Sequence, residues 1–448
     1  MKRYESWGRY PRATHRDAIC AATRLPPQLD RLPAPVLAYG KGRSYGDCCL
    51  NDGGFLLDTS QLNKIESFDA ESGILRCEAG VTLAEILRMA VPRGWFPAVV
   101  PGTKFVTVGG AIANDIHGKN HHREGTFGRS LRQFELRRSN GETLRCSPTE
   151  NLEYLRATIG GLGLTGLILR AEIQLKKIPS SWIEAERIRF DSLEDFFSLS
   201  AESDRKFEFT VAWLDFFAPA AKTGRGVFFR GNFAEAAASR KTVPPRGSAV
   251  GILADCPEWL INRGAVRLFN LAYGRGSAGS VKKSLVSYDS FFFPLDGIHN
   301  WNRLYGKRGF FQYQCVVPPK DARGAMEEIL RRVRASREIP SLSVLKTFGD
   351  VESPGLLSFP RPGVTLALDL ANRGASTLQL MDELDEIVRG CGGAVYPAKD
   401  ARMSAASYKA YFPRWREFQR IVDPCFSSSF WRRVTPAGCE RNSQKAPG

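Results

Sequence analysis

The chain has 448 residues, of which 43% are hydrophobic and 25% are charged, so a chain that is disordered along its whole length is excluded. Lys and Arg exceed Asp and Glu by 63 − 47 = +16 charges at neutral pH. This excess favours a negatively charged partner or substrate, such as a phosphorylated compound, an anionic membrane surface or nucleic acid.

The first 180 residues alternate short predicted strands with helices. Apolar runs bounded by turn residues predict strands at 35–39, 55–58, 74–79, 134–138, 143–146 and 167–175. Capping boxes at Thr82–Glu85 and Ser147–Glu150 predict helices that end near Pro92 and Ala157.

The composition changes after Pro179 and becomes richer in Phe and Trp. Predicted strands at 209–217, 310–317, 342–348 and 364–370 and helices at 323–336 and 378–389 indicate a sheet with helices on one face. We expect a mobile loop at 273–290, directly before Phe291-Phe292-Phe293-Pro294. The segment from Tyr396 reads as helical, basic and aromatic. The organisation is therefore 1–180, 181–393 and 394–448.

No run of about 18 apolar residues predicts a membrane-spanning helix, and residues 1–10 lack the apolar segment of a signal peptide. The ten cysteines contain no C-x-x-C pair, so we expect free thiols in a reducing compartment. These features predict a cytoplasmic protein.

Three glycine-rich clusters could hold a phosphate: 40–47, 101–122 and 161–166. The third matches G-x-G-x-x-G but precedes a strand instead of a helix, which argues against a nicotinamide site. The second contains His117, His121 and His122, but Gly118 and the lack of a nearby acidic residue argue against a metal site, and none is predicted.

The motifs GKGRSYGD (40–47), PGTKFVTVGGAIANDIHGKNHH (101–122), GLGLTG (161–166), FPLDGIHNWNRLYG (293–306) and YPAKD (396–400) resemble those of the vanillyl-alcohol-oxidase-type FAD-linked oxidoreductases. Within that group the chain is most similar to the decaprenylphosphoryl-β-D-ribose 2′-oxidase family. The matches occur in family order and cover nearly the whole chain.

This resemblance implies an α+β protein of two domains, with a PCMH-type FAD-binding domain and a substrate domain that has an antiparallel sheet and helices. Residues 1–180 would form the first part of the FAD domain, 181–393 the substrate domain, and 394–448 a segment that returns to the FAD domain. Many relatives carry a histidine, covalently bonded to the flavin, where this chain has Arg43, so non-covalent FAD is implied. The implied cofactor-binding residues are Gly40, Lys41, Gly42, Arg43, Ser44, Tyr45, Gly46, Asp47, Gly102, Thr107, Val108, Gly109, Gly110, Asn114, Asp115, Ile116, His117, Leu167 and Tyr396.

The resemblance also implies roles in catalysis. Lys399 would supply the positive charge that stabilises the reduced, anionic flavin. His117 and Tyr45 would position the substrate or remove its hydroxyl proton. The implied substrate-binding residues are Lys346, Gln312, Gln314, Thr365 and Lys119.

Two departures from the family pattern leave the substrate open. Ala367 stands where the mycobacterial-type pattern has a cysteine, and Thr365 stands where it has an asparagine. Phe291–Phe293 occupies positions where Tyr and His are found.

The leading hypothesis is FAD-dependent oxidation of the ribose 2′-hydroxyl of a polyprenylphosphoryl-β-D-ribose. A separate NAD(P)H-dependent keto-sugar reductase would complete an epimerisation to the arabinose form for cell-envelope glycan synthesis. The basic C-terminus and the Phe-rich segment suit peripheral contact with an anionic membrane, on the cytoplasmic face of the inner membrane or on its periplasmic face.

Two alternatives remain. One is an FAD-dependent oxidase of a small soluble polyol or aldonolactone. The other is a basic nucleic-acid-binding protein, against which we count the absence of a recognisable nucleic-acid module.

Overall fold

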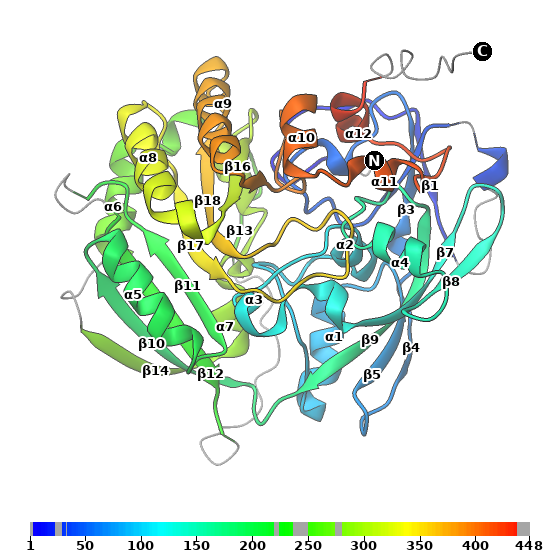
Figure 1. Ribbon diagram of the computed structural model, residues 1–448, viewed down its shortest axis with the longest axis horizontal. Coiled ribbons are helices and arrows are strands. Elements are labelled where there is room, and N and C mark those ends of the chain that lie inside the picture. The colour runs from blue at the N-terminus through cyan, green and yellow to red at the C-terminus, as the bar shows by residue number, and fades with distance from the viewer. Residues whose placement is uncertain are drawn as a thin grey trace.

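The computed structural model describes residues 3–22, 29–32, 34–218, 224–235, 250–273 and 280–436. They form two bodies that lie side by side (Figure 1). One body contains the blue and cyan N-terminal strands, and the other contains the green and yellow sheet with its helices. This is the predicted α+β architecture of two domains.

The N-terminal body contains two sheets. Three parallel strands pair in the order β1-β3-β2, and a second sheet has the order β4-β5-β9-β7-β8, with β6 also paired to β9. The strands are β1 (Asp17–Cys20), β2 (Val36–Tyr39), β3 (Phe55–Asp58), β4 (Ile65–Phe68), β5 (Ile74–Glu78), β6 (Trp95–Pro97), β7 (Leu131–Arg137), β8 (Thr143–Cys146) and β9 (Leu167–Lys177). The helices are α1 (Leu83–Ala90), α2 (Val108–Ala113), α3 (His121–Glu124) and α4 (Leu152–Thr158).

The second body is built on one antiparallel sheet of eight strands in the order β14-β10-β12-β11-β17-β18-β16-β19. Its strands are β10 (Trp182–Phe190), β11 (Phe209–Leu214), β12 (Gly226–Phe233), β14 (Val281–Ser287), β16 (Phe310–Val317), β17 (Leu342–Phe348), β18 (Gly363–Ala371) and β19 (Ala394–Val395). A separate parallel pair joins β13 (Val250–Gly251) to β15 (Ile298–His299). The helices are α5 (Leu193–Asp204), α6 (Arg263–Tyr273), α7 (Tyr288–Phe292), α8 (Ala322–Ala335) and α9 (Ala375–Gly390).

The C-terminal segment lies against the N-terminal strands. Its helices are α10 (Ala405–Tyr411), α11 (Trp415–Gln419) and α12 (Ser429–Val434), drawn in orange and red beside the blue strands in Figure 1. The backbone of Val36 in β2 exchanges hydrogen bonds with Cys425 and Ser427, at 2.8 and 3.0 Å. The boundaries at residues 180 and 393 stay predictions, and β19, just beyond the second, pairs with β16 of the large sheet.

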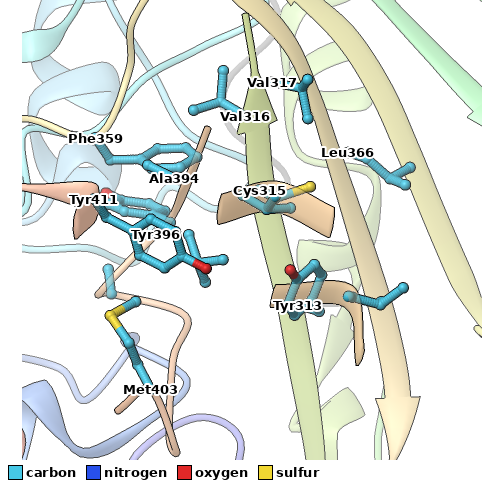
Figure 2. Close-up of a cluster of buried hydrophobic side chains, with 14 of the residues drawn as sticks. Tyr313, Cys315, Val316, Val317, Phe359, Leu366, Ala394, Tyr396, Met403 and Tyr411 are labelled. Atoms are coloured by element: carbon cyan, nitrogen blue, oxygen red, sulfur yellow. The ribbon is translucent and has the colours of Figure 1, made fainter. Parts of the chain in front are cut away.

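One hydrophobic core connects the large sheet to the C-terminal helices. Figure 2 shows Phe359, Tyr396 and Tyr411 on one side of β16 and Leu366 on the other. The rings of Phe359 and Tyr396 stack with their centroids 4.6 Å apart. Tyr396 is therefore held rigidly where the chain leaves the second body.

Two sequence predictions about local structure are wrong. Ser147 and Glu150 form an isolated bridge in a turn, and the helix begins only at Leu152, so no capping box forms there. Most of the loop expected at 273–290 is ordered: β14 pairs with β10, and Ser287 then caps α7. The sheet pairing outweighs the low apolar content of this stretch, and residues 274–279 lie outside the described residues.

A buried ion-pair cluster fastens α12 to the first glycine cluster. Arg433 binds Asp47 at 2.7 Å and Asp400 at 3.0 Å, and the two acids are only 3% and 5% exposed. Asp400 also accepts a hydrogen bond from the backbone of Met403 at 2.9 Å. One arginine thus connects the glycine cluster, the YPAKD segment and the last helix.

We expect Arg433→Met to lower the free energy of unfolding by about 3–5 kcal/mol, because it leaves two buried carboxylates without their cation. Denaturant unfolding of the variant would measure this loss. The matched control is Arg414→Met, which breaks an exposed pair with Glu417 and should cost about 1 kcal/mol or less. Equal losses in the two variants would contradict the role assigned to Arg433.

Candidate active site

A cavity of about 630 Å³ lies between the two bodies. The three glycine clusters line it from the N-terminal body. Strands β11, β16, β17 and β18 and the segment around α7 line it from the second body. The cavity therefore brings together segments that are far apart in the sequence.

The backbone of the first glycine cluster packs directly against Thr107 and Tyr39. A Cβ on Gly40 would lie 2.5 Å from Thr107 Oγ1, and one on Gly42 would lie 2.1 Å from Tyr39 Oη. Gly42 also has φ +60°, a conformation that favours glycine. Side chains are excluded at both positions, and the backbone itself forms this wall of the cavity.

The second cluster supplies polar groups to the same wall. Thr107 caps α2 by accepting a hydrogen bond from Gly110 N at 3.2 Å. Asn114 donates to Gly110 O at 2.8 Å, which leaves its Oδ1 buried and without a hydrogen-bond partner. Arg43 Nε is likewise buried and unpartnered, although the guanidinium lies 3.9 Å from the centroid of the Trp7 ring.

These features fit an FAD molecule. The glycine walls admit a flat ring system and a pyrophosphate, and the unpartnered Asn114 and Arg43 atoms offer an acceptor and a donor to it. Gly163 and Gly166 of the third cluster and Leu167, the first residue of β9, also line the cavity. Tyr396 Oη donates to the backbone oxygen of Asn114 at 2.7 Å, which ties the C-terminal segment to this wall.

Most predicted cofactor-binding residues line the cavity, and four do not. Gly46 packs so closely that a Cβ would lie 1.5 Å from Asp400 O. Asp47 binds Arg433, and Val108 is buried in the core. Asp115 accepts a 2.9 Å hydrogen bond from Gly128 N and bonds from two serines. These four residues lie outside the cavity lining and support the glycine clusters through their contacts with the rest of the protein.

His117 lies at the centre of a polar cluster that spans both bodies. Its Nδ1 is 2.9 Å from Lys346 Nζ, and its Nε2 is 3.1 Å from Gln314 Nε2. Gln314 also contacts Thr365 Oγ1 at 3.2 Å. Burial, followed by the charge of Lys346, lowers the pKa of His117 well below its usual value, so the imidazole is neutral at pH 7.

Three lysines line the cavity near this histidine. Burial lowers the pKa of Lys119 to about 8 and that of Lys346 to about 7, and Lys119 and Lys399 further depress the pKa of Lys346. Lys119 Nζ donates to the backbone oxygen of Phe292 at 3.2 Å. Their mutual repulsion favours an anionic ligand between them.

Lys399 lies over Tyr45, with its Nζ 3.8 Å from the ring centroid. Burial lowers the pKa of Lys399 to about 7, and the nearby Asp369 opposes this shift. Burial also raises the pKa of Tyr45 well above its usual value, so Tyr45 remains a phenol. The predicted residues Lys399, Tyr45, Gln312, Lys346 and His117 all face one cavity.

Sequence reasoning missed Asp369, an acidic residue on β18. Its Oδ1 accepts a hydrogen bond from Gln312 Nε2 at 2.5 Å, while Oδ2 is buried without a hydrogen-bond partner. Asp369 is 1% exposed, and burial raises its pKa to about 7. The sequence signal that could have identified Asp369 is that it is the single acidic residue in the largely apolar stretch 363–371.

Comparison with known proteins identifies the family. A family model described as an FAD binding domain matches residues 12–147. The decaprenylphosphoryl-beta-D-ribose oxidase of Mycolicibacterium smegmatis is 35% identical over 411 residues, which cover 89% of each chain.

More limited similarity extends to other proteins. An uncharacterized protein of Streptomyces coelicolor is 32% identical over 372 residues, covering 79% of this chain and all of that one. Cytokinin dehydrogenase 4 of Arabidopsis thaliana is 27% identical over 180 residues, covering 39% of this chain and 34% of its own. Together with the glycine walls and the lysine-lined cavity, these matches show that the chain belongs to the decaprenylphosphoryl-β-D-ribose oxidase family of FAD-dependent oxidoreductases.

Proposed function

We propose that this protein oxidises the ribose 2′-hydroxyl of a polyprenylphosphoryl-β-D-ribose to the 2′-keto sugar. The observation that carries the proposal is the convergence of Lys119, Lys346 and Lys399 on the cavity that the glycine clusters also line. Their charges suit a substrate that brings a phosphate into the site. The name of the Mycolicibacterium relative supports the same substrate class.

Bound FAD supplies the acceptor for the hydride that leaves the sugar carbon. We infer that His117 receives the hydroxyl proton: its lowered pKa keeps the imidazole neutral, and departure of the hydride makes the hydroxyl acidic enough for this weak base to accept its proton. Lys346 holds the imidazole at Nδ1, and the substrate hydroxyl would take the place of Gln314 at Nε2, the nitrogen that accepts the proton. Tyr45, held as a phenol by its raised pKa, positions the substrate by donating a hydrogen bond.

A non-covalent flavin belongs to this proposal. Arg43 lies at the position where many relatives link a histidine to the flavin, and a guanidinium cannot form that bond. Acid precipitation of the FAD-loaded protein should therefore leave the yellow colour in the supernatant. A pellet that stays yellow would contradict non-covalent binding and favour an oxidase of small polyols or aldonolactones.

The product defines the expected partners. A 2′-keto sugar is reducible, so a separate NAD(P)H-dependent reductase would convert it to the arabinose form used in cell-envelope glycans. The lipid tail of the substrate requires peripheral contact with a membrane, and we propose the cytoplasmic side of the inner membrane. Among the described residues, no helix has both the length and the apolar character needed to cross a bilayer.

Anaerobic mixing of the FAD-loaded protein with polyprenylphosphoryl ribose tests the proposal directly. We expect the flavin absorption to bleach, because without oxygen the reduced cofactor accumulates. Free polyols and aldonolactones at the same concentration serve as controls and should leave the flavin oxidised. Bleaching by these soluble sugars alone would support the alternative oxidase.

The Asp369→Asn variant tests how the charge of Lys399 is maintained. A lysine is charged below its pKa, and Asp369 raises the pKa of Lys399. Removing the carboxylate should lower that pKa further, so the decline of flavin reduction rate with rising pH should move to lower pH.

The reference variant is Lys399→Met, which we expect to slow flavin reduction by about 10²–10³-fold, as loss of one electrostatic group at a developing charge does. This variant should also lack the alkaline decline, because the titrating group is gone. The matched control is Lys320→Met, an exposed lysine outside the cavity, which should behave like the unaltered protein. An unchanged pH profile in Asp369→Asn would rule out the proposed coupling.

A further inference from the structure

The second body presents a concentrated set of exposed apolar side chains. Within the described part of the chain, the large apolar residues that are exposed come from the segment 250–273 and from β15, apart from Leu152 and Val281. Leu253, Trp259 and Leu268 are 89%, 71% and 69% exposed. We call this set the apolar rim: Val250, Leu253, Trp259, Leu260, Leu268 and Ile298.

The apolar rim is ordered and connected to the cavity. Val250 pairs with Ile298 between β13 and β15, and Ile252 N donates to His299 O at 2.9 Å. Three residues beyond Ile298 lies Trp301, which lines the cavity together with Pro294 and Leu295. The chain therefore runs directly from Ile298 of the apolar rim into the wall of the cavity.

Helix α6 shows that the exposure is built into the fold. Its inner face buries Val266, which is 6% exposed, and Asn270, whose Nδ2 donates to Asp215 Oδ1 at 3.0 Å. The outer face carries Leu268 beside the exposed Arg263 and Arg267. Leu268, which directly follows Arg267 and is 69% exposed, is not needed to pack this helix.

The charges around the apolar rim are mainly positive. Exposed basic side chains in and beside these segments are Arg263, Arg267, Lys282 and Lys307, whereas Lys283 and Arg308 pair with Glu186 and Glu258. The acids in the segment 250–273 are already paired: Asp255 with Arg9 at 2.6 Å, and Glu258 with Arg308 at 3.4 Å. Apolar side chains including a tryptophan, surrounded by Lys and Arg, match the interface of a bilayer that contains anionic lipids.

We propose that the apolar rim and its basic border rest on an anionic lipid bilayer, so that a membrane-anchored substrate reaches the cavity without its tail leaving the lipid. This inference rests on the proposed function for the identity of the substrate, but the docking itself can be measured alone. The proposal places the membrane contact on the apolar rim, whereas the sequence predicts it at the Phe-rich segment. Phe292 and Phe293 are only 1% and 2% exposed and pack in an aromatic cluster.

Sedimentation with sucrose-loaded vesicles tests the proposal on the full FAD-loaded chain. We expect binding to phosphatidylcholine vesicles that contain phosphatidylglycerol, weaker binding to phosphatidylcholine alone, and a loss of affinity as salt rises. The double variant Leu253→Ser, Trp259→Ser should bind about tenfold or more weakly, because both side chains would enter the bilayer. Unchanged binding of this variant would overturn the proposal.

The matched control is Leu152→Ser, which makes the same change at an exposed leucine of the other body and should bind like the unaltered protein. Equal, salt-independent binding to both vesicle types would overturn the role of the basic border. Loss of binding to the purified keto-sugar reductase, with vesicle binding intact, would assign the rim to a protein partner instead and overturn the membrane proposal.

Activity measurements separate this proposal from the proposed function. The double variant should oxidise a short-chain, water-soluble prenylphosphoryl ribose at the unaltered rate, and lose turnover only of long-chain substrate in vesicles. If no prenylphosphoryl ribose reduces the flavin of the unaltered protein, the proposed function fails, while the vesicle measurements still decide the docking surface.

Discussion

The structure depends on positive charge held in the cavity between its two bodies. Burial lowers the pKa of Lys119, Lys346 and Lys399, the charges of Lys119 and Lys399 lower that of Lys346 further, and Asp369 opposes the shift on Lys399. Such a cluster is unfavourable unless anionic groups join it. A flavin cofactor with its pyrophosphate and a phosphate-bearing substrate would supply those groups. The cavity is therefore built for a complex with two anionic ligands.

The two bodies divide this task. The N-terminal body offers backbone at Gly40 and Gly42, where the close approach leaves no room for side chains, together with the side chains of His117 and Lys119. The second body offers side chains from β16, β17 and β18, which carry Gln312, Gln314, Lys346 and Thr365. The C-terminal segment joins them, because Tyr396 packs in the core of one and bonds to Asn114 of the other. Arg433 then fixes the glycine cluster beside Lys399.

Much of this could be predicted from the sequence. Strands rich in apolar residues, such as β16 and β17, have the bounds that the sequence predicts, and the glycine motifs locate one wall of the cavity. The prediction of secondary structure fails where pairing with a distant strand determines the conformation. The lysines of β14 argued against a strand there, but β14 pairs with β10 and is a strand. Asp369 was missed because only the fold brings it to Gln312 and Lys399. The ion pair of Arg433 with Asp47 spans 386 positions and could not be predicted for the same reason.

The central claim is the proposed oxidation of the ribose 2′-hydroxyl, which the similarity to the Mycolicibacterium oxidase and the lysines of the cavity support. The most direct measurement compares anaerobic flavin reduction by a prenylphosphoryl ribose with reduction by its 2′-deoxy analogue, which keeps the phosphate and the lipid but lacks the reacting group. The account predicts that the ribose compound bleaches the flavin and that the deoxy compound binds without bleaching it. Equal bleaching by both compounds would contradict oxidation at the 2′ position.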